Sequence, residues 1–177
     1  REACQTCVKI AREAGVMVSF DPNIRKEVMK SDAAKQRLYE GIKNADVIAP
    51  TFEEAKFVTG LEDPLEILEE LHSLGPQVIA LTRDKDGAIV SDGNKVVFVE
   101  GMSVDAIHPT RAGDTFATML IYGIQEGWEL EKIAVYCNCA GSLAVTKQGS
   151  IGRALPTLEE VEALVKQGNC KYRVEMR

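Results

Sequence analysis

The sequence predicts an α/β fold in which helices cover a mainly parallel sheet. Two observations support this prediction. Short apolar, β-favouring runs alternate with longer amphipathic helical patterns along most of the chain. In one place two apolar runs are separated only by an Asp-Gly turn, which is typical of a β-hairpin. Because strands separated by helices normally run parallel, we expect this hairpin at an edge of the sheet.

The first part of the chain alternates helix and strand. Residues 1–15 carry a helical pattern that ends at Gly15, and the apolar run VMVSF then predicts a strand before the polar turn DPN. The elements expected next are a helix over 31–44, a strand in DVIAP, a short helix in TFEEAKFVTG closed by Gly60, and an amphipathic helix in PLEILEELHSLG.

The second part begins with a buried-type strand and ends in helices. Its expected elements are a strand in QVIALT, the hairpin GAIVSDGNKVVFVEG, and helices near 113–127, 129–147 and 157–168. No linker, repeat or low-complexity segment interrupts the pattern, so we expect a single α/β domain over 1–177. The polar segments DPN, PTFEE and TRDKDG each follow a strand, and parallel strands would gather them along one ligand-binding rim.

Composition and charge exclude several classes of partner. The chain is 45% hydrophobic and 27% charged, with a net charge of −6. This excess of acid gives no basic field for a polyanion, so we expect no nucleic acid and no membrane as partner. The sequence has neither a long apolar span nor the pattern of a signal peptide, which predicts a cytoplasmic protein.

The five cysteines favour reduced thiols over a secreted disulfide framework, because their number is odd. Cys4 and Cys7 form a C-x-x-C pair, and Cys137 and Cys139 a C-x-C pair, so a four-thiolate metal site is conceivable. Two positions apart on a helix, however, side chains point about 200° away from each other. Buried small residues are the favoured interpretation.

Asp114 stands where an apolar helix begins, directly after Gly113 in the segment HPTRAGDTFATMLIYG. A helix start offers free N–H groups and the positive end of the dipole to phosphate oxygens, and a carboxylate there could accept a proton from an attacking hydroxyl. Acids are common in first helical turns for electrostatic reasons alone. Spacing by itself favours this structural interpretation of Asp114 over a catalytic one.

For Glu54 and the DPNIR segment, too, the sequence is compatible with either a structural or a functional role. Thr51 to Glu54 fits a capping box, which would account for the glutamate structurally, as it would for Thr157 to Glu160. On a strand-end rim Glu54 could instead help to position hydrated Mg²⁺. Asn23 and Arg25 follow a buried strand, and a turn and a role near substrate or phosphate are equally compatible with the sequence.

Five segments taken together resemble the carboxyl-terminal part of the ribokinase/PfkB family of carbohydrate kinases. In chain order they are FDPNIR, DVIAPTFEEAKFVTG, LTRDKDGAIV, PTRAGDTFATMLIYG and AVTKQGSIGRALPTLEEVEALV. The resemblance implies a three-layer α/β/α ribokinase-like fold, here lacking the amino-terminal half and the β lid. It also implies ATP-dependent phosphoryl transfer to a hydroxyl of a sugar or similar small alcohol, with Mg²⁺. The ending GSIGRALPT is more similar to fructokinase-like members.

The resemblance also assigns roles to residues. Asp114 would be the base, and the backbone N–H groups of Ala112, Gly113 and Asp114 would form the anion hole for the transferred phosphoryl group. Glu54 would act near Mg²⁺ through water, with Thr51 in place of the family's Asn. The remaining positions are Thr82 and Gly87 beside the nucleotide phosphates, Asn138 beside the adenine, and Asn23 and Arg25 near the acceptor.

Three further residues depart from the family pattern. His108 replaces an Asp that in several members helps to hold a monovalent cation. Arg111 replaces a Gly in the anion hole, where it would restrict the backbone or pair with a phosphate. Asp84 replaces a Gly in the phosphate loop, where its charge would repel a triphosphate. These changes motivate an alternative function as a catalytically impaired, kinase-like binding or scaffold protein.

The missing half would contain most of the sugar-recognition residues, so the chain does not identify its sugar. An incomplete sheet edge and uncovered apolar helix faces would favour self-association into a homo-oligomer if the chain were expressed alone. A nucleotide-binding α/β module that serves another reaction is a third, less favoured interpretation.

Overall fold

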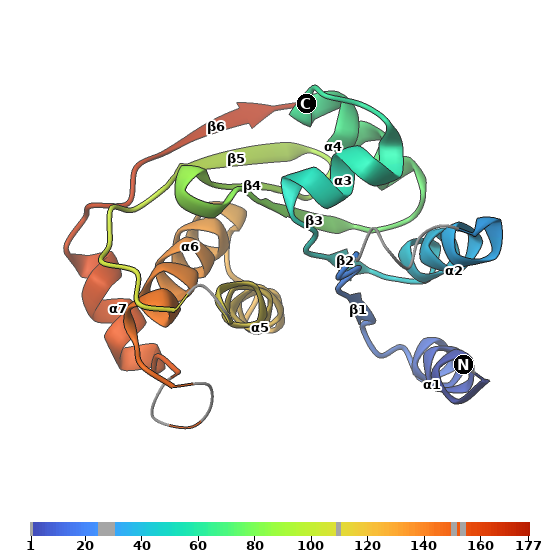
Figure 1. Ribbon diagram of the computed structural model, residues 1–177, viewed down its shortest axis with the longest axis horizontal. Helices are drawn as coiled ribbons and strands as arrows, with labels where there is room; N and C mark the ends of the chain where they lie inside the picture. The colour runs from blue at the N-terminus through green and yellow to red at the C-terminus, as the bar shows by residue number, and fades with distance from the viewer. Residues whose placement is uncertain (1, 25–30, 109–110, 150–151, 153–154) are drawn as a thin grey trace. The chain divides into compact units, whose positions relative to one another are not determined.

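The structure, a computed structural model, describes residues 2–24, 31–108, 111–149, 152 and 155–177 (Figure 1). Two compact units make up the chain, Arg1–Ile79 and Ala80–Arg177. The strands are hydrogen-bonded in the order β1-β2-β3-β4-β5-β6, and the boundary between the units falls within β3 (Val78–Thr82). The predicted α/β architecture is confirmed, whereas the single domain over 1–177 stays a prediction.

The first unit consists of helices and very short parallel strands. Its elements are α1 (Glu2–Glu13), β1 (Ser19–Phe20), α2 (Asp32–Lys43), β2 (Val47–Ile48), α3 (Phe52–Thr59), α4 (Pro64–Ser73) and the first residues of β3. The pairs β1–β2 and β2–β3 are parallel, as expected. Only two residues of VMVSF and two of DVIAP form strand, fewer than the apolar runs predict.

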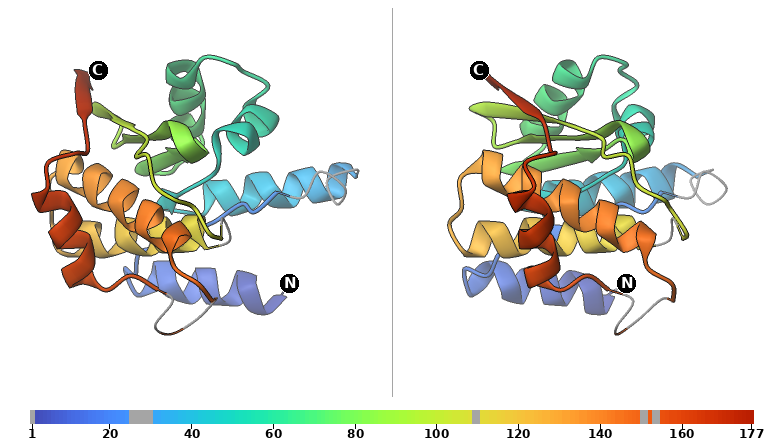
Figure 2. Two further views of the ribbon diagram at one scale, coloured as in Figure 1. Left: turned by 60° about the vertical axis from the view of Figure 1, so that its left-hand side comes forward. Right: turned by 90° about the vertical axis from the view of Figure 1, so that its left-hand side faces the viewer.

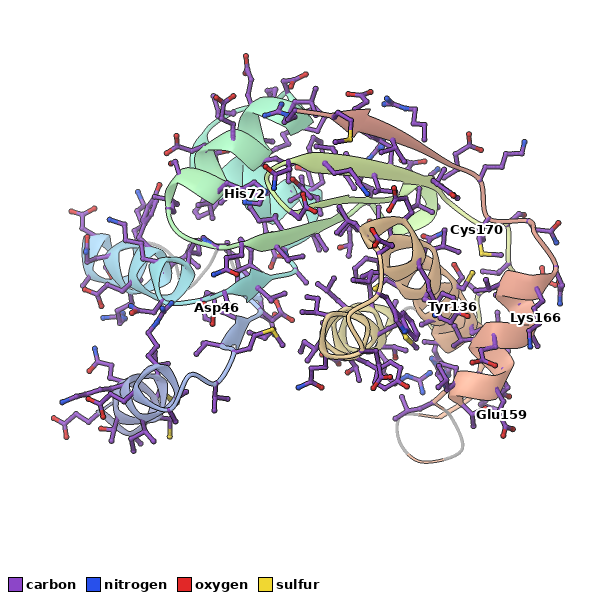
Figure 3. All side chains as sticks on the ribbon, turned by 180° about the vertical axis from the view of Figure 1, so that it is seen from behind. Asp46, His72, Tyr136, Glu159, Lys166 and Cys170 are labelled. Carbon is purple, nitrogen blue, oxygen red and sulfur yellow. The ribbon has the colours of Figure 1, made fainter. Side chains whose placement is uncertain are left out.

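Asp46 explains why these strands start where they do. Its carboxylate oxygen Oδ2 accepts a hydrogen bond from the Val18 amide at 2.7 Å, and its carbonyl accepts one from the Gln77 amide at 2.8 Å. Asp46 therefore satisfies backbone groups of the chain ahead of β1 and ahead of β3, just before β2 begins (Figure 3). This side chain replaces ladder hydrogen bonds at one end of the parallel strands.

Helix boundaries in the first unit follow the capping residues in the sequence. Thr51 and Glu54 form the predicted capping box at the start of α3, and Gly60 ends that helix with a left-handed φ of 74°. Asp63 accepts hydrogen bonds from two amides at the start of α4, with Pro64 in the first turn. The buried side chains of this unit include Ile42, Ile48, Ile67, Leu68, Leu71 and Ile79.

The second unit contains an antiparallel ladder and three helices. Its elements are the rest of β3, the 3₁₀ turn η1 (Asp84–Asp86), β4 (Gly87–Ser91), β5 (Lys95–Glu100), α5 (Ala112–Gln125), α6 (Leu130–Thr146), α7 (Leu158–Lys166) and β6 (Tyr172–Met176). The predicted hairpin is confirmed, with β4 antiparallel to β5. The sequence analysis did not anticipate β6, which pairs antiparallel with β5 and so moves the hairpin one strand in from the edge.

Helix α6 is the central helix of the second unit. It packs against β4 and β5 on one side and contacts both α5 and α7 (Figures 1 and 2). Gly123 allows the close approach of α5, because a Cβ there would lie 2.9 Å from Ile133 Cγ1 and 3.2 Å from Trp128 Cε3. The packing fixes the axis of α5, whose first turn carries Asp114.

Two glycines bring the loop after β3 onto the end of β5. A Cβ at Gly87 would lie 2.0 Å from the Val99 carbonyl oxygen, and one at Gly101 would lie 1.7 Å from the Lys85 carbonyl oxygen. Gly87 also has a φ of 95°, which L side chains rarely adopt. Neither position has room for a larger residue, so the loop conformation depends on both.

We predict that Gly101→Ala lowers the free energy of unfolding of the second unit by at least about 2 kcal/mol, because the new methyl group would overlap backbone that cannot rotate away. Urea denaturation followed by circular dichroism measures this loss. Gly113→Ala is the matched control, since a Cβ there meets nothing within 4 Å. In the first turn of α5 it should change stability by less than about 1 kcal/mol. Equal effects of the two substitutions would contradict the steric explanation.

Candidate functional site

In the first unit, the segment after β1 is attached to the start of α3. The Ile24 amide donates a hydrogen bond to Glu54 Oε1, and the Asn23 amide donates to Asp21 Oδ1 at 3.0 Å. Asn23 has a φ of 37°, in the left-handed region that asparagine tolerates better than most residues. The structure thus brings Asn23 and Glu54, two of the predicted site residues, into neighbouring positions. Arg25 lies outside the described residues.

Glu54 caps α3 and still retains capacity to bind a ligand. Its Oε2 accepts hydrogen bonds from the Thr51 amide at 2.8 Å and the Thr51 hydroxyl at 2.9 Å, while Oε1 accepts the one from Ile24. A carboxylate has about four lone-pair sites, so one site on Oε1 remains for a further donor. Direct chelation would compete with these bonds, whereas a water molecule of hydrated Mg²⁺ could donate to that oxygen. The arrangement therefore fits contact with Mg²⁺ through water.

In the second unit, the loop from Thr82 to Gly87 is closed by its own backbone. The Arg83 amide donates to the Gly87 carbonyl at 2.8 Å, and the Asp86 amide donates to the Arg83 carbonyl at 2.9 Å. Asp84 has a φ of 50°, a conformation that glycine adopts without strain. The loop therefore keeps a glycine-like backbone at Asp84, and the side chain of this residue is exposed.

The start of α5 presents the three amides expected of the anion hole. Ala112, Gly113 and Asp114 are its first three residues, and no side chain caps the helix at Arg111. The first three N–H groups of a helix have no partner within it. Gly113 and Asp114 are exposed, so the amide edge and the carboxylate lie at the surface of this unit.

Thr115, in the same turn, has a buried hydroxyl. Its Oγ1 has no hydrogen-bond partner among the described residues. A buried hydroxyl normally finds a partner, because an unsatisfied one costs about 1–3 kcal/mol. The first turn of α5 thus contains exposed amides, a carboxylate and an unsatisfied hydroxyl close together.

Arg111 turns its side chain toward the end of α6. The guanidinium Nη2 donates to the carbonyl oxygens of Ala144 at 3.4 Å and Lys147 at 3.1 Å, and the residue is only 8% exposed. Its backbone has a φ of 89°, which again suits glycine. These contacts favour a structural role for Arg111 over the predicted position beside a phosphate.

His108 belongs to the same end of α6. The amides of Ile107 and His108 both donate to the Val145 carbonyl, at 2.8 and 3.0 Å. Lys147 Nζ in turn donates to both carboxylate oxygens of Glu160, at 2.7 and 2.6 Å, and this hydrogen bond holds the pKa of Glu160 below its ordinary value. The carboxyl end of α6 is thus hydrogen-bonded both to the segment before α5 and to the start of α7.

Asn138 contacts the end of β5 rather than open solvent. It is 7% exposed, and its Nδ2 donates to the Glu100 carbonyl at 3.0 Å and to Cys170 Sγ at 3.5 Å. Glu100 precedes Gly101, which lies against the loop that contains Gly87. Gly87 and Asn138, two of the predicted nucleotide residues, therefore both contact the end of β5, whereas Thr82 is the last residue of β3. The sequence analysis missed Gly101 and Cys170, since no local motif marks either residue.

Within the described parts of the chain, no three His, Cys, Asp or Glu side chains gather as a metal site. Cys4 and Cys7 are exposed, whereas Cys137 and Cys139 are buried. No helix that the structure describes is both long enough and apolar enough to cross a bilayer.

Comparison with known proteins gives consistent matches. Residues 1–158 match the family model described as pfkB family carbohydrate kinase. The chain is 29% identical to the fructokinase of Escherichia coli over 171 residues, which is 92% of this chain and 55% of that protein. It is 31% identical to 2-dehydro-3-deoxygluconokinase of Bacillus subtilis over 156 residues, covering 87% of this chain and 48% of that protein. The chain thus spans about half the length of the curated relatives it matches.

Solved structures agree with the fold. A protein described as ribokinase II from E. coli, in complex with ATP and Mg²⁺, is similar with a TM-score of 0.87 and 28% identity, over 93% of this chain and 53% of that one. The fructokinase of Vibrio cholerae, with fructose, ADP and calcium ion bound, has a TM-score of 0.80 and 28% identity, over 92% and 55% of the two chains. The expected ribokinase-like α/β fold is confirmed.

We predict that Arg111→Ala and Arg111→Gly both destabilise the second unit, because each removes the hydrogen bonds to the α6 carbonyls. Arg111→Gly should be the more stable of the two by about 1 kcal/mol, since glycine adopts the left-handed backbone without strain. Urea denaturation of both variants gives the difference directly. Arg83→Ala, at an exposed position with an ordinary φ, serves as the control. Equal stability of the alanine and glycine variants would show that the backbone at Arg111 is not strained.

Proposed function

Because the chain belongs to the pfkB family of carbohydrate kinases, we propose that it acts in ATP-dependent phosphoryl transfer to a hydroxyl of a sugar or a similar small alcohol. The observation that carries this proposal is the first turn of α5, where uncapped amides lie beside the exposed carboxylate of Asp114. The complexes of similar proteins with ATP and Mg²⁺, or with fructose and ADP, support the same reaction class.

Asp114 is the proposed base. Its carboxylate accepts the proton of the acceptor hydroxyl as the oxygen attacks, and this raises the nucleophilicity of that oxygen. The amides of Ala112, Gly113 and Asp114 donate to the oxygens of the transferred phosphoryl group. Charge on these oxygens is stabilised by donors that the helix has already oriented, so little reorganisation is needed.

Thr82, Gly87 and Asn138 are the proposed nucleotide contacts. The close approach of the Gly87 loop to the end of β5 supports a preformed backbone surface for the phosphates. The Asn138 amide, already anchored to the Glu100 carbonyl, would lie near the adenine. In the first unit Glu54 would receive a hydrogen bond from a metal-bound water, and Asn23 and Arg25 would lie near the acceptor. Mg²⁺, when bound, neutralises charge on the phosphates.

A second candidate function is binding without catalysis. It is favoured by Asp84, whose carboxylate is exposed in the loop proposed to face the phosphates. Isothermal titration calorimetry of the full-length protein with MgATP separates the two functions. Absence of binding supports the scaffold, and binding with turnover of a sugar supports the kinase.

Asp114→Asn in the full-length protein should lower turnover by about 10²–10⁴-fold, because the amide cannot accept the proton. MgATP affinity should change little, since the backbone amides remain. A coupled assay of ADP release measures turnover, and calorimetry measures affinity. Glu126→Gln, at the opposite end of the same helix, is the control and should leave both unchanged. Retained phosphorylation in Asp114→Asn would rule out Asp114 as the base.

Glu54→Gln should separate the capping role of this residue from the role near the metal. The one oxygen of glutamine can complete the capping box, but its NH2 group cannot accept from the Ile24 amide, so stability should fall by about 1 kcal/mol. Loss of the charge should raise the Mg²⁺ concentration needed for half-maximal activity by about ten-fold. Glu53→Gln, on the same turn but exposed, should not alter the Mg²⁺ dependence. An unchanged Mg²⁺ requirement in Glu54→Gln would restrict Glu54 to capping.

A further inference from the structure

Two cysteines that are far apart in the sequence meet in the second unit. Cys139 lies on α6 and is fully buried. Cys170 lies on the connection from α7 to β6 and is partly buried (Figure 3). Cys170 packs against the buried cluster that contains Cys139. Met102 lies beside them, with its sulfur 3.7 Å from Cys139 Sγ.

Cys170 accepts a hydrogen bond that favours its thiolate. The neighbouring Cys139 thiol lowers the pKa of Cys170 to about 7, and the hydrogen bond from Asn138 Nδ2, 3.5 Å from the sulfur, acts in the same direction, although burial opposes both. The same contact with Cys170, together with burial, raises the pKa of Cys139. Cys170, partly exposed and with a lowered pKa, thus has the properties of an oxidisable cysteine, and the buried Cys139 is the candidate resolving partner in the adjoining cluster.

The other cysteine of α6 is different. Cys137 is fully buried, and burial raises the pKa of its thiol. It is also two residues from Cys139, which places it on another side of the helix. Cys137 is thus a matched control for Cys139, on the same element and with equal burial.

We propose that Cys170 is an oxidation site that forms a disulfide with Cys139. Hydrogen peroxide is the oxidant. The Cys170 thiolate attacks one peroxide oxygen, the O–O bond breaks, and hydroxide leaves and takes up a proton, which gives a sulfenic acid and water. Cys139 then loses its proton and attacks the Cys170 sulfur, so that the S–S bond forms and the S–O bond breaks with release of a second water. The two thiols lose two electrons in total, and peroxide accepts them.

The disulfide would join α6 to the connection ahead of β6 beside two existing attachments. The Glu100 amide donates to the Lys171 carbonyl at 3.0 Å, and the Glu100 carbonyl accepts from Asn138. Lys171 directly follows Cys170 in the sequence, and Asn138 directly precedes Cys139. These hydrogen bonds hold the segments that carry the two cysteines at the end of β5.

Peptide mapping tests the proposal on the chain with Cys4→Ser and Cys7→Ser, which removes the exposed C-x-x-C pair. After treatment with hydrogen peroxide, tryptic digestion without reductant should yield residues 133–147 linked to residues 167–171. The chain should lose the mass of two hydrogens. The link should persist in Cys137→Ala and disappear in Cys139→Ala, where dimedone should trap Cys170 as the sulfenic acid. Before oxidation, iodoacetamide should label Cys170 at least about ten-fold faster than Cys137.

Several results would overturn the proposal. They are a link that survives in Cys139→Ala but not in Cys137→Ala, no link at all in the folded parent chain, or labelling of Cys170 no faster than that of Cys137. Cys170→Ser provides the same test at the partly exposed position if Cys139→Ala fails to fold. It should abolish the link and leave Cys139 unmodified, and oxidation of Cys139 in that variant would contradict the role of Cys170.

Discussion

The carbonyl groups at the carboxyl end of α6 need hydrogen-bond donors, and the arrangement of the second unit depends on how they obtain them. The last carbonyls of a helix have no partner within it. Here the amides of Ile107 and His108 and the guanidinium of Arg111 supply the donors. These hydrogen bonds attach Ile107, His108 and Arg111 to the end of α6. Because α5 begins directly after Arg111, the same bonds help to position its first turn, which carries Asp114.

Two of the residues that depart from the family pattern, His108 and Arg111, are hydrogen-bonded to this end of α6. His108 contributes its backbone amide to the end of α6, and Arg111 contributes a nearly buried side chain. Both Arg111 and Asp84 have a positive φ, so the chain keeps glycine-like backbone at both positions with larger residues. A left-handed residue with a side chain costs about 1–2 kcal/mol. At Arg111 the hydrogen bonds to α6 offset that cost, and they leave the amides of the helix start uncovered.

Local signals in the sequence predicted most of the elements but not the contacts between distant ones. The Thr51 capping box, Gly60 and the Asp-Gly turn each act within a few residues, and each appears as expected. Strand lengths were overestimated around Asp46, whose side chain takes the place of ladder bonds. The direction of the Arg111 side chain could not be predicted, because its acceptors lie on another helix. For the same reason no local pattern indicates that Cys170 packs against the cluster that contains Cys139.

The position of β6 has a consequence for the order in which the second unit assembles. β4 and β5 are joined by a short turn, so their pairing closes only a small loop and can form early. β6 pairs with β5 only after α5, α6 and α7 have intervened, and such long-range pairing forms slowly. The ribosome releases all three helices before β6. During synthesis β5 therefore stays an open edge, and this nascent chain is most exposed to aggregation until residues 172–176 have docked.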